Sequence, residues 1–341
     1  MRTILLIYTG GTIGMVRDPS TGLLRPLDFS HLLRQIPELN QFDFRIDTTT
    51  FDPVVDSSEI QPPFWQRLAR MVYDHYDRYD GFVILHGTDT MAYTASALSF
   101  MLRGLNKPVI LTGSQLPIGT LRTDGKENLI SSLEIAAAVD EQGHPMVPEV
   151  SIYFEYKLFR GNRTTKYSAE TFNAFQSPNY PLLAETGVHI HYDRHAIRPC
   201  RAKERLELLD RLVTDVIFLK IFPGLPGYYV ETLCQMPALQ GIILETYGAG
   251  NAPTTGSLLS PLHRFMEEGG IVLNISQCSA GAVDMEQYET GKRLQETGVI
   301  GGKDLTKEAA LTKMMHVLAT DLPTDMKKSA LQRPICGEMN D

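Results

Sequence analysis

The chain has 341 residues, which is more than one compact core usually contains, so we expect two domains. Hydrophobic residues make up 43% and charged residues 21% of the chain, which predicts a folded globular protein and argues against disorder. The formal net charge of -8 argues against a nucleic-acid partner, because binding of nucleic acid normally needs a basic face.

The first residues predict a cytoplasmic protein. The letters MRT lead directly into the apolar run of residues 4–8, which ends at Thr9. A secretory signal peptide needs a longer apolar region and a cleavage site of small residues, and no run in the chain approaches the length of a membrane span. The four cysteines show no Cys-X-X-Cys spacing, which favours reduced thiols over a zinc site or a redox pair.

Short apolar runs alternate with longer helical patterns along the chain. The runs that we predict to form strands are residues 4–8, 81–85, 109–111, 150–154, 216–219, 241–244 and 271–275. The segments that we predict to form helices are residues 63–76, 90–102, 125–139, 226–235, 260–268 and 305–318. The strand runs are apolar throughout, which indicates strands covered on both faces. The alternation therefore predicts an α/β protein with mostly parallel sheets.

The alternation lapses at residues 191–212, a stretch rich in histidine and arginine. A basic binding patch is one interpretation, but the acidic character of the whole chain favours a solvated linker. We therefore predict a larger N-terminal α/β domain over residues 1–190, which carries the functional residues. A linker over residues 191–212 and a smaller, Rossmann-like α/β domain over residues 213–341 follow it.

Three of the predicted strands end in turns that carry small hydroxyl side chains. Residues 9–14 read TGGTIG, residues 86–90 read HGTDT, and residues 112–115 read TGSQ. In a parallel sheet the carboxyl ends of the strands meet at one edge, and ligands bind there. Glycine in each turn permits positive φ and lets a ligand approach the main-chain N–H groups. The three turns together predict a site made of hydroxyl groups, one carboxylate and accessible backbone.

Each of these features also has a structural explanation. Asp89 stands where a residue would cap the following helix, and glycines often mark strand-to-helix turns. A nucleotide site fails on spacing, because Thr9 stands where a dinucleotide fingerprint needs glycine and no Gly-Lys-Ser/Thr follows for a P-loop. A threonine nucleophile would need a neighbouring base. Lys166 lies in the basic stretch 160–166, where a lysine is by itself expected to be solvated and inert.

Taken together, the motifs resemble those of the cytoplasmic type I L-asparaginases. The matching stretches are TGGTIG at 9–14, DSS at 56–58, HGTDTMA at 86–92, TGSQ at 112–115, RGNRTTK at 160–166, YGAGNAP at 247–253 and GVIGG at 298–302. They span nearly the whole chain, and the TGGTIG and HGTDTMA motifs together are specific to this superfamily. The Gly-Ser-Gln form of the TGSQ motif, without a signal peptide, points to type I rather than to the secreted type II.

The resemblance implies hydrolysis of L-asparagine to L-aspartate and ammonia through an acyl-enzyme, with no metal or other cofactor. Thr12 would attack the side-chain amide carbon of the substrate. Thr88, Asp89 and Lys166 would form the supporting triad, in which Lys166 receives a proton through Thr88. Asp89 would also hold the α-ammonium group of the substrate. The other residues implied to bind substrate are Gly11, Asp56, Ser57, Ser58, Gly87, Ser114, Gln115 and Asn251. A homodimer or homotetramer is implied as well.

Some of these residues have simpler explanations when each is taken alone. The DSS stretch at 56–58 matches a local helix cap, and Asn251 before Ala252-Pro253 matches a turn. Only the joint match with the other motifs raises them to candidate substrate-binding residues.

The chain departs from the family pattern at two positions. Family members commonly carry a tyrosine on a lid after the first motif, but residues 20–26 contain none, and Leu23 or Leu24 takes the expected position. Some type I enzymes are activated by asparagine at a second site, near which an arginine is common. Glu245 stands in that region and would repel the carboxylate of the effector, so we expect asparagine activation to be weak or absent.

Two other functions compete with this prediction. A relative that prefers glutamine differs by one methylene in its substrate, which is a small difference to discriminate. A transamidation subunit would need an additional N-terminal domain, which a first strand so near the start argues against. A non-catalytic amino-acid sensor would explain the missing lid tyrosine, but it would have no use for Thr12 together with the triad.

Overall fold

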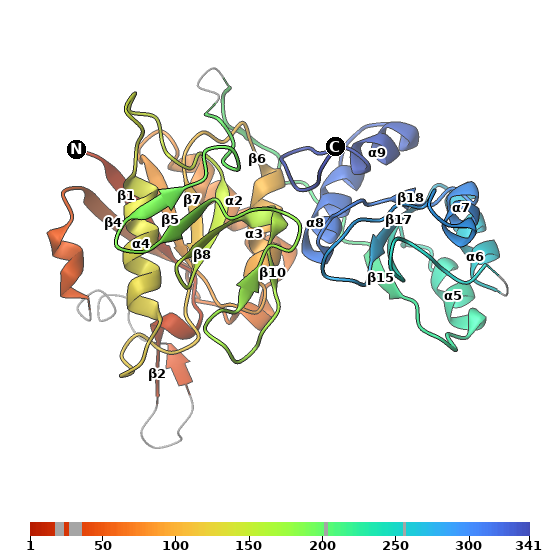
Figure 1. The fold of residues 1–341 in the computed structure, drawn as a ribbon, viewed down its shortest axis with the longest axis horizontal. Helices are drawn as coiled ribbons and strands as arrows, with labels where there is room; N and C mark the ends of the chain where they lie inside the picture. The colour runs from red at the N-terminus through yellow and green to blue at the C-terminus, as the bar shows by residue number, and fades with distance from the viewer. Residues whose placement is uncertain (18–23, 27–35, 201–203, 255–256) are drawn as a thin grey trace. The chain divides into compact units, whose positions relative to one another are not determined.

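In the computed structural model of the chain, residues 1–17, 24–26, 36–200, 204–254 and 257–341 are described. The chain divides into two compact units, Met1–Leu209 and Asp210–Asp341 (Figure 1). Each unit is built on a sheet whose central strands are parallel. The predicted fold class, two α/β domains with mostly parallel sheets and the larger one first, is confirmed. Among the described helices, none combines the length and the apolar content that a membrane crossing requires.

The first unit contains an eight-stranded sheet in the order β13-β12-β9-β8-β7-β5-β1-β4. Its strands are β1 (Thr3–Tyr8), β4 (Arg45–Thr50), β5 (Gly81–Leu85), β7 (Val109–Thr112), β8 (Val150–Phe154), β9 (Lys157–Arg160), β12 (Ala184–Thr186) and β13 (Ile190–Tyr192). The five strands β4, β1, β5, β7 and β8 are parallel, and β9, β12 and β13 continue the sheet antiparallel.

The order of the parallel strands determines where a ligand site can form. From β1 the chain moves to β4 on one side, and it then crosses to β5 on the other side of β1. The strand order therefore reverses between β1 and β5. In open α/β sheets ligands bind outside the carboxyl ends of the strands at such a switch point. The turns that follow β1 and β5 are the TGGTIG and HGTDT motifs.

Helices and short strands complete the first unit. The α-helices are α2 (Pro62–Asp74), α3 (Met91–Met101) and α4 (Gly125–Ala137), and the 3₁₀ helices are η1 (Thr12–Gly14), η2 (Pro37–Gln41), η3 (Ser57–Glu59) and η4 (Gly161–Arg163). Three two-stranded sheets pair β2 (Met15–Arg17) with β3 (Leu24–Pro26), β6 (Leu102–Arg103) with β14 (Glu207–Leu208), and β10 (Thr165–Lys166) with β11 (Phe175–Gln176).

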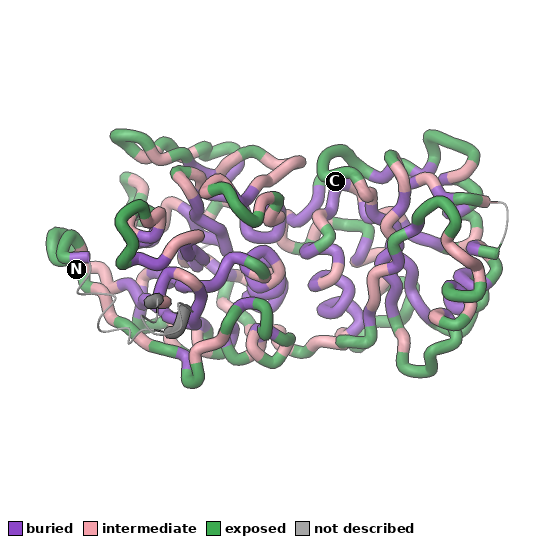
Figure 2. The backbone as a smooth tube through the Cα atoms, turned by 90° about the horizontal axis from the view of Figure 1, so that it is seen from below, coloured by how far each residue is buried: buried purple, intermediate pink, exposed green. Residues whose placement is uncertain are grey.

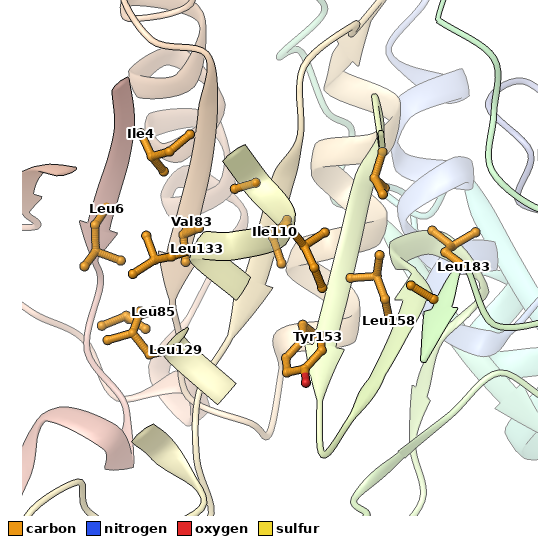
Figure 3. Close-up of a cluster of buried hydrophobic side chains, with 14 of the residues drawn as sticks. Ile4, Leu6, Val83, Leu85, Ile110, Leu129, Leu133, Tyr153, Leu158 and Leu183 are labelled. Atoms are coloured by element: carbon orange, nitrogen blue, oxygen red, sulfur yellow. The ribbon is translucent and has the colours of Figure 1, made fainter. Parts of the chain in front are cut away.

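The core of the first unit explains why the strands are apolar throughout. Leu129 and Leu133 of α4 pack with alternate residues of the sheet, namely Ile4, Leu6, Val83 and Leu85 (Figure 3). The intervening residues of β1 and β5 are also fully buried, and strand geometry directs them to the opposite face of the sheet. Because both faces of β1 and β5 are covered, the residues on both faces of these strands are apolar.

Elements with polar sequences escaped the prediction. Strand β4 reads RIDTTT, and it pairs only with β1 because it is the edge strand of the sheet. Helix α7 (Glu289–Glu296) reads ETGKRLQE and buries only Gly291 and Leu294. In such elements the hydrophobic signal that identifies a strand or helix is weak.

The predicted linker differs from the structure, because its described residues up to 209 belong to the first unit. Strand β13 is the last strand of the sheet, and Ala196 and Ile197 are buried in the core around α4. Strand β14 pairs with β6. These few apolar residues stand among histidines and arginines, so composition alone concealed them. The division between the units falls between Leu209 and Asp210.

The second unit contains a four-stranded parallel sheet in the order β15-β16-β17-β18. Its strands are β15 (Val216–Lys220), β16 (Gly241–Thr246), β17 (Ile271–Ser276) and β18 (Ile300–Gly301), and its helices are α5 (Gly227–Cys234), α6 (Leu259–Glu267), α7, α8 (Lys307–Leu318) and α9 (Thr324–Leu331). In each unit the buried residues concentrate in the central strands and the helix faces that pack on them (Figure 2).

A buried ion pair fastens the last residues of the second unit. Lys313 of α8 and Glu338 are both fully buried, and Lys313 Nζ lies 2.7 Å from Glu338 Oε1. The ammonium group also donates to the carbonyl oxygens of Leu331 and Arg333. The carboxylate accepts hydrogen bonds from the backbone N–H groups of the turn before it. Each charge therefore has the partners that make its burial tolerable.

We expect Lys313→Met to destabilise the chain by roughly 3–5 kcal/mol, because it leaves the Glu338 carboxylate buried without its counter-charge. The double variant Lys313→Met/Glu338→Gln removes both charges and keeps an acceptor for the backbone, so it should be more stable than the single variant. Urea unfolding measures both, with Lys307→Met on the exposed side of α8 as the control. Equal stability of the single variant and the control would contradict this role.

Candidate active site

The turns after β1 and β5 are in direct backbone contact. A Cβ atom on Gly11 would lie 2.4 Å from the Gly87 nitrogen, and Gly11 has a φ of 87°. A Cβ atom on Gly87 would lie 2.4 Å from Ser57 Oγ of η3. Both positions therefore require glycine, because any side chain would force the segments apart. The contact brings together the segments that carry Thr12, Thr88 and Ser57, as the sequence predicts.

Lys166 completes the group from a fourth segment. It lies in β10, and its Nζ donates to Thr88 Oγ1 at 2.8 Å and to Asp89 Oδ1 at 2.7 Å. The Lys166 side chain is 16% exposed, whereas that of Asp89 is 61% exposed. The expectation of a solvated, inert lysine is therefore wrong. Asp89 is not a helix cap either, since α3 begins after Thr90 without a side-chain cap and the Asp89 carboxylate binds Lys166.

The neighbouring arginines hold the segment that carries Lys166. Arg160 is buried, and its Nε donates to Glu149 Oε2 at 2.6 Å. The guanidinium groups of Arg160 and Arg163 lie 4.3 and 4.9 Å from the ring centroid of Tyr180. These are cation–π distances, so the arginines anchor the segment inside the protein. The arginines of the basic stretch thus have a structural role, whereas Lys166 at its end contacts Thr88 and Asp89.

The third turn enters the site through Gln115. Its Oε1 accepts a hydrogen bond from Thr88 Oγ1 at 3.4 Å. Ser114 is buried, and its hydroxyl donates to the Leu116 carbonyl. The backbone N–H groups of Gln115 and Leu116 donate to the Asp124 carboxylate. Sequence reasoning missed Asp124, which follows Thr123 just before α4 and matches an ordinary helix start.

Thr12 lies at the start of η1, directly after Gly11. Its side chain is half-buried, and no hydrogen bond joins it to another residue in the part of the chain that the structure describes. Leu23, expected at the place of the lid tyrosine, lies outside the described residues, as does the side chain of Leu24.

Two of the predicted substrate-binding residues are already hydrogen-bonded to each other. Asp56 Oδ1 accepts from the backbone N–H and the hydroxyl of Ser58, which is the local cap of η3. Ser57 is buried against Gly87, and its carbonyl accepts the Thr90 hydroxyl. All three residues nevertheless lie beside the contact between Gly11 and Gly87.

The second unit contains the remaining predicted residues. Asn251 closes a turn with Tyr247, and its Oδ1 accepts the Thr290 hydroxyl. Its predicted contact with substrate stays a prediction. Glu245 lies in β16, largely buried, with Lys220 Nζ 3.9 Å from its Oε2. A weak ion pair of this kind leaves the negative charge of Glu245 only partly compensated.

His86 stabilises the HGTDT turn through hydrogen bonds of both of its ring nitrogens. The ring is fully buried, and burial lowers the pKa of His86 from 6.5 to about 4. Its Nδ1 lies 2.6 Å from the Gly87 carbonyl oxygen, which can only accept, so Nδ1 carries the hydrogen. Nε2 then accepts the Thr94 hydroxyl at 2.9 Å. His86 is therefore a neutral structural residue near pH 7 and offers the site no positive charge.

The pKa of His86 predicts how stability depends on pH. Between pH 6.5 and about 4 the unfolded chain binds a proton at this residue that the folded chain does not bind. Stability contributed by His86 should therefore fall as the pH falls through this window, by about 3 kcal/mol in total. His86→Gln should make the pH dependence of the urea midpoint shallower there, whereas exposed His191→Gln should leave it unchanged. Identical pH dependence of both variants would contradict a neutral buried His86.

Two family models match the chain, one in each unit. Residues 3–198 match the family model described as "Asparaginase, N-terminal", and residues 215–330 match "Glutaminase/Asparaginase C-terminal domain". The chain is 43% identical to "L-asparaginase 1" of Escherichia coli strain K12, over 99% of this chain and 98% of that protein.

Two solved structures are similar over the whole chain. L-asparaginase I from Vibrio cholerae superposes with a TM-score of 0.88 at 38% identity. The thermostable L-asparaginase from Thermococcus kodakarensis superposes with a TM-score of 0.90 at 35% identity. In both comparisons 99% of each chain is covered.

Proposed function

Since the chain belongs to the asparaginase family, whose N-terminal and C-terminal domains it contains, we propose that it hydrolyses L-asparagine to L-aspartate and ammonia. The observation that carries this proposal is the position of Lys166, whose Nζ lies within hydrogen-bond distance of both Thr88 and Asp89. The group stands at the sheet edge where the Thr12 turn contacts the Thr88 turn. A hydroxyl nucleophile, a relay hydroxyl and a lysine are thus gathered at one place.

Thr12 is the nucleophile in this proposal. Its hydroxyl attacks the side-chain amide carbon of asparagine, ammonia leaves, and water hydrolyses the acyl-enzyme. The attacking hydroxyl must lose its proton, and Lys166 in its neutral form receives a proton through Thr88. Asp89 keeps Lys166 in place and compensates the charge that it gains. Backbone N–H groups near Gly11 or Thr88 stabilise the oxyanion, an interaction that contributes roughly 3–4 kcal/mol in enzymes where it has been removed.

The remaining groups suit a small zwitterionic amide. Asp89 is exposed enough to bind the α-ammonium group while it holds Lys166. Ser57 and Ser58 bind the α-carboxylate in this proposal, for which the Ser58 hydroxyl exchanges its hydrogen bond to Asp56 Oδ1 for one to the substrate. The main-chain atoms of Ser114 contact the amide end in this proposal, since its hydroxyl already donates to the Leu116 carbonyl. We further propose that the enzyme acts in the cytoplasm as a homodimer or homotetramer.

The first test measures ammonia release from L-asparagine and L-glutamine by the wild type and two variants. Thr12→Ala should lose at least about 10³-fold in kcat, because no other group can form the acyl-enzyme. Thr12→Ser keeps a hydroxyl and should retain measurable activity. A wild type that binds asparagine in a calorimeter but releases no ammonia would overturn the proposal and favour the amino-acid sensor. An active Thr12→Ala would exclude Thr12 as the nucleophile.

A second test concerns regulation. Because the Glu245 carboxylate would repel the carboxylate of an effector, the rate should depend hyperbolically on asparagine concentration. Initial rates over a wide concentration range measure this dependence. A sigmoidal curve for the wild type would contradict the expectation.

A further inference from the structure

Gln115 connects two parts of the candidate site. Its Nε2 donates to the carbonyl oxygen of Thr171 at 3.0 Å, and its Oε1 accepts from Thr88 Oγ1 at 3.4 Å. The carbonyl of Thr171 can only accept a hydrogen bond, which fixes the orientation of the amide group. Oε1 must therefore be the atom that faces Thr88.

The orientation of Gln115 determines where the Thr88 hydrogen points. Lys166 in its charged form has only donors, so Thr88 Oγ1 accepts from Lys166 Nζ at 2.8 Å. The hydrogen of the Thr88 hydroxyl is then available to Gln115 Oε1, which can only accept. The three groups form one directed chain from Lys166 through Thr88 to Gln115. The contact between Thr88 and Gln115 is longer than an ordinary O–H···O bond, as catalytic contacts often are before substrate binds.

We propose that Gln115 is a positioning residue that directs the hydroxyl of Thr88 and thereby sets the protonation of Lys166 during hydrolysis of the substrate amide. This role rests on the proposed amidohydrolase function and differs from the direct contact with substrate that the family resemblance implies. Gln115 acts on the proton relay through Thr88.

The backbone of Gln115 is fixed well enough for this role. The Asp124 carboxylate accepts its N–H at 2.9 Å and the N–H of Leu116 at 3.1 Å. Asn128 Nδ2 donates both to Asp124 and to the Gly113 carbonyl, and its Oδ1 accepts the N–H of Glu155. The turn is thus held from its buried side, and only the amide group of Gln115 projects toward Thr88.

The amide nitrogen of Gln115 binds the segment that carries Lys166. Thr171 lies between β10 and β11, which pair Lys166 with Phe175 and Thr165 with Gln176. The Gln115 amide therefore joins Thr88 to the hairpin that presents the lysine. Asp89 is the charged group that faces Lys166 within the described part of the chain.

The directed chain places the Thr88 oxygen as a hydrogen-bond acceptor for Lys166 Nζ. When Thr88 donates to Gln115, its oxygen becomes a better acceptor for the ammonium group. Loss of the acceptor weakens this support, so the neutral form that acts as base should appear at lower pH. A negative charge at the same position should have the opposite effect, because it stabilises the ammonium group.

The test compares pH profiles of kcat/KM for ammonia release from L-asparagine. Gln115→Met keeps the length of the side chain and removes its polar atoms, and it should move the acidic limb down by roughly half a pH unit to one unit. Gln115→Glu should move the limb up. In Gln115→Met, kcat should fall about 3- to 10-fold while KM changes less than about twofold. Gln295→Met, on the exposed side of α7, is the matched control.

Each alternative gives a different result. A residue that contacts substrate raises KM and leaves the acidic limb in place, which would overturn the proposal. A purely structural residue lowers kcat and the urea midpoint in both variants with no shift of the limb, which would also overturn it. Limbs that move in opposite directions in the two variants support it. A wild type that releases no ammonia at any pH overturns the proposed function itself, whereas an active wild type with unmoved limbs overturns only the role of Gln115.

Discussion

The contact between Gly11 and Gly87 is the constraint on which the candidate site depends. Two neighbouring strands end side by side, and their turns touch through backbone atoms alone. A Cβ at either position would overlap an atom of the other turn or of Ser57. Thr12 and Thr88 therefore follow the two contacting glycines on adjacent turns. Both turns lie at the switch point of the sheet, the place where ligands bind in open α/β sheets.

The buried ionisable side chains near this contact are either neutral or stabilised by a partner. His86, directly before Gly87, is fully buried, and burial lowers its pKa to about 4, so it remains neutral near pH 7. Arg160 and Arg163 are buried too, but Glu149 and Tyr180 stabilise them away from the relay. The ammonium group that reaches Thr88 belongs to Lys166, and its counter-charge is the exposed carboxylate of Asp89.

Hydrogen bonds fix the segments that surround the candidate site. Asp124 and Asn128 fasten the turn of Gln115 through backbone contacts, and the hairpin of Lys166 is held through Gln115 and the buried arginines. The side chain of Thr12, by contrast, has no hydrogen-bonded partner in the described residues. In the proposed mechanism, the Thr12 hydroxyl is therefore the group that the substrate must orient.

The sequence by itself determined the strands and the turns at their ends. Residues 4–8 and 81–85 are apolar throughout because both sheet faces are covered, and the glycines after them are required by backbone contact, so both signals are local. The family motifs likewise singled out Thr12, Thr88, Asp89, Lys166 and Gln115 as candidate residues. Tertiary structure alone decided which groups the side chains of Lys166 and Gln115 contact. A lysine in a run of arginines is solvated unless distant partners bury that run, and here the partners are Glu149 and Tyr180. The direction of the Gln115 amide depends on the Thr171 carbonyl, which comes from another segment. Composition also concealed the edge strand β4 and the packing of Ile197, because polar neighbours hide a strand or a core residue whose partners lie far away in the chain.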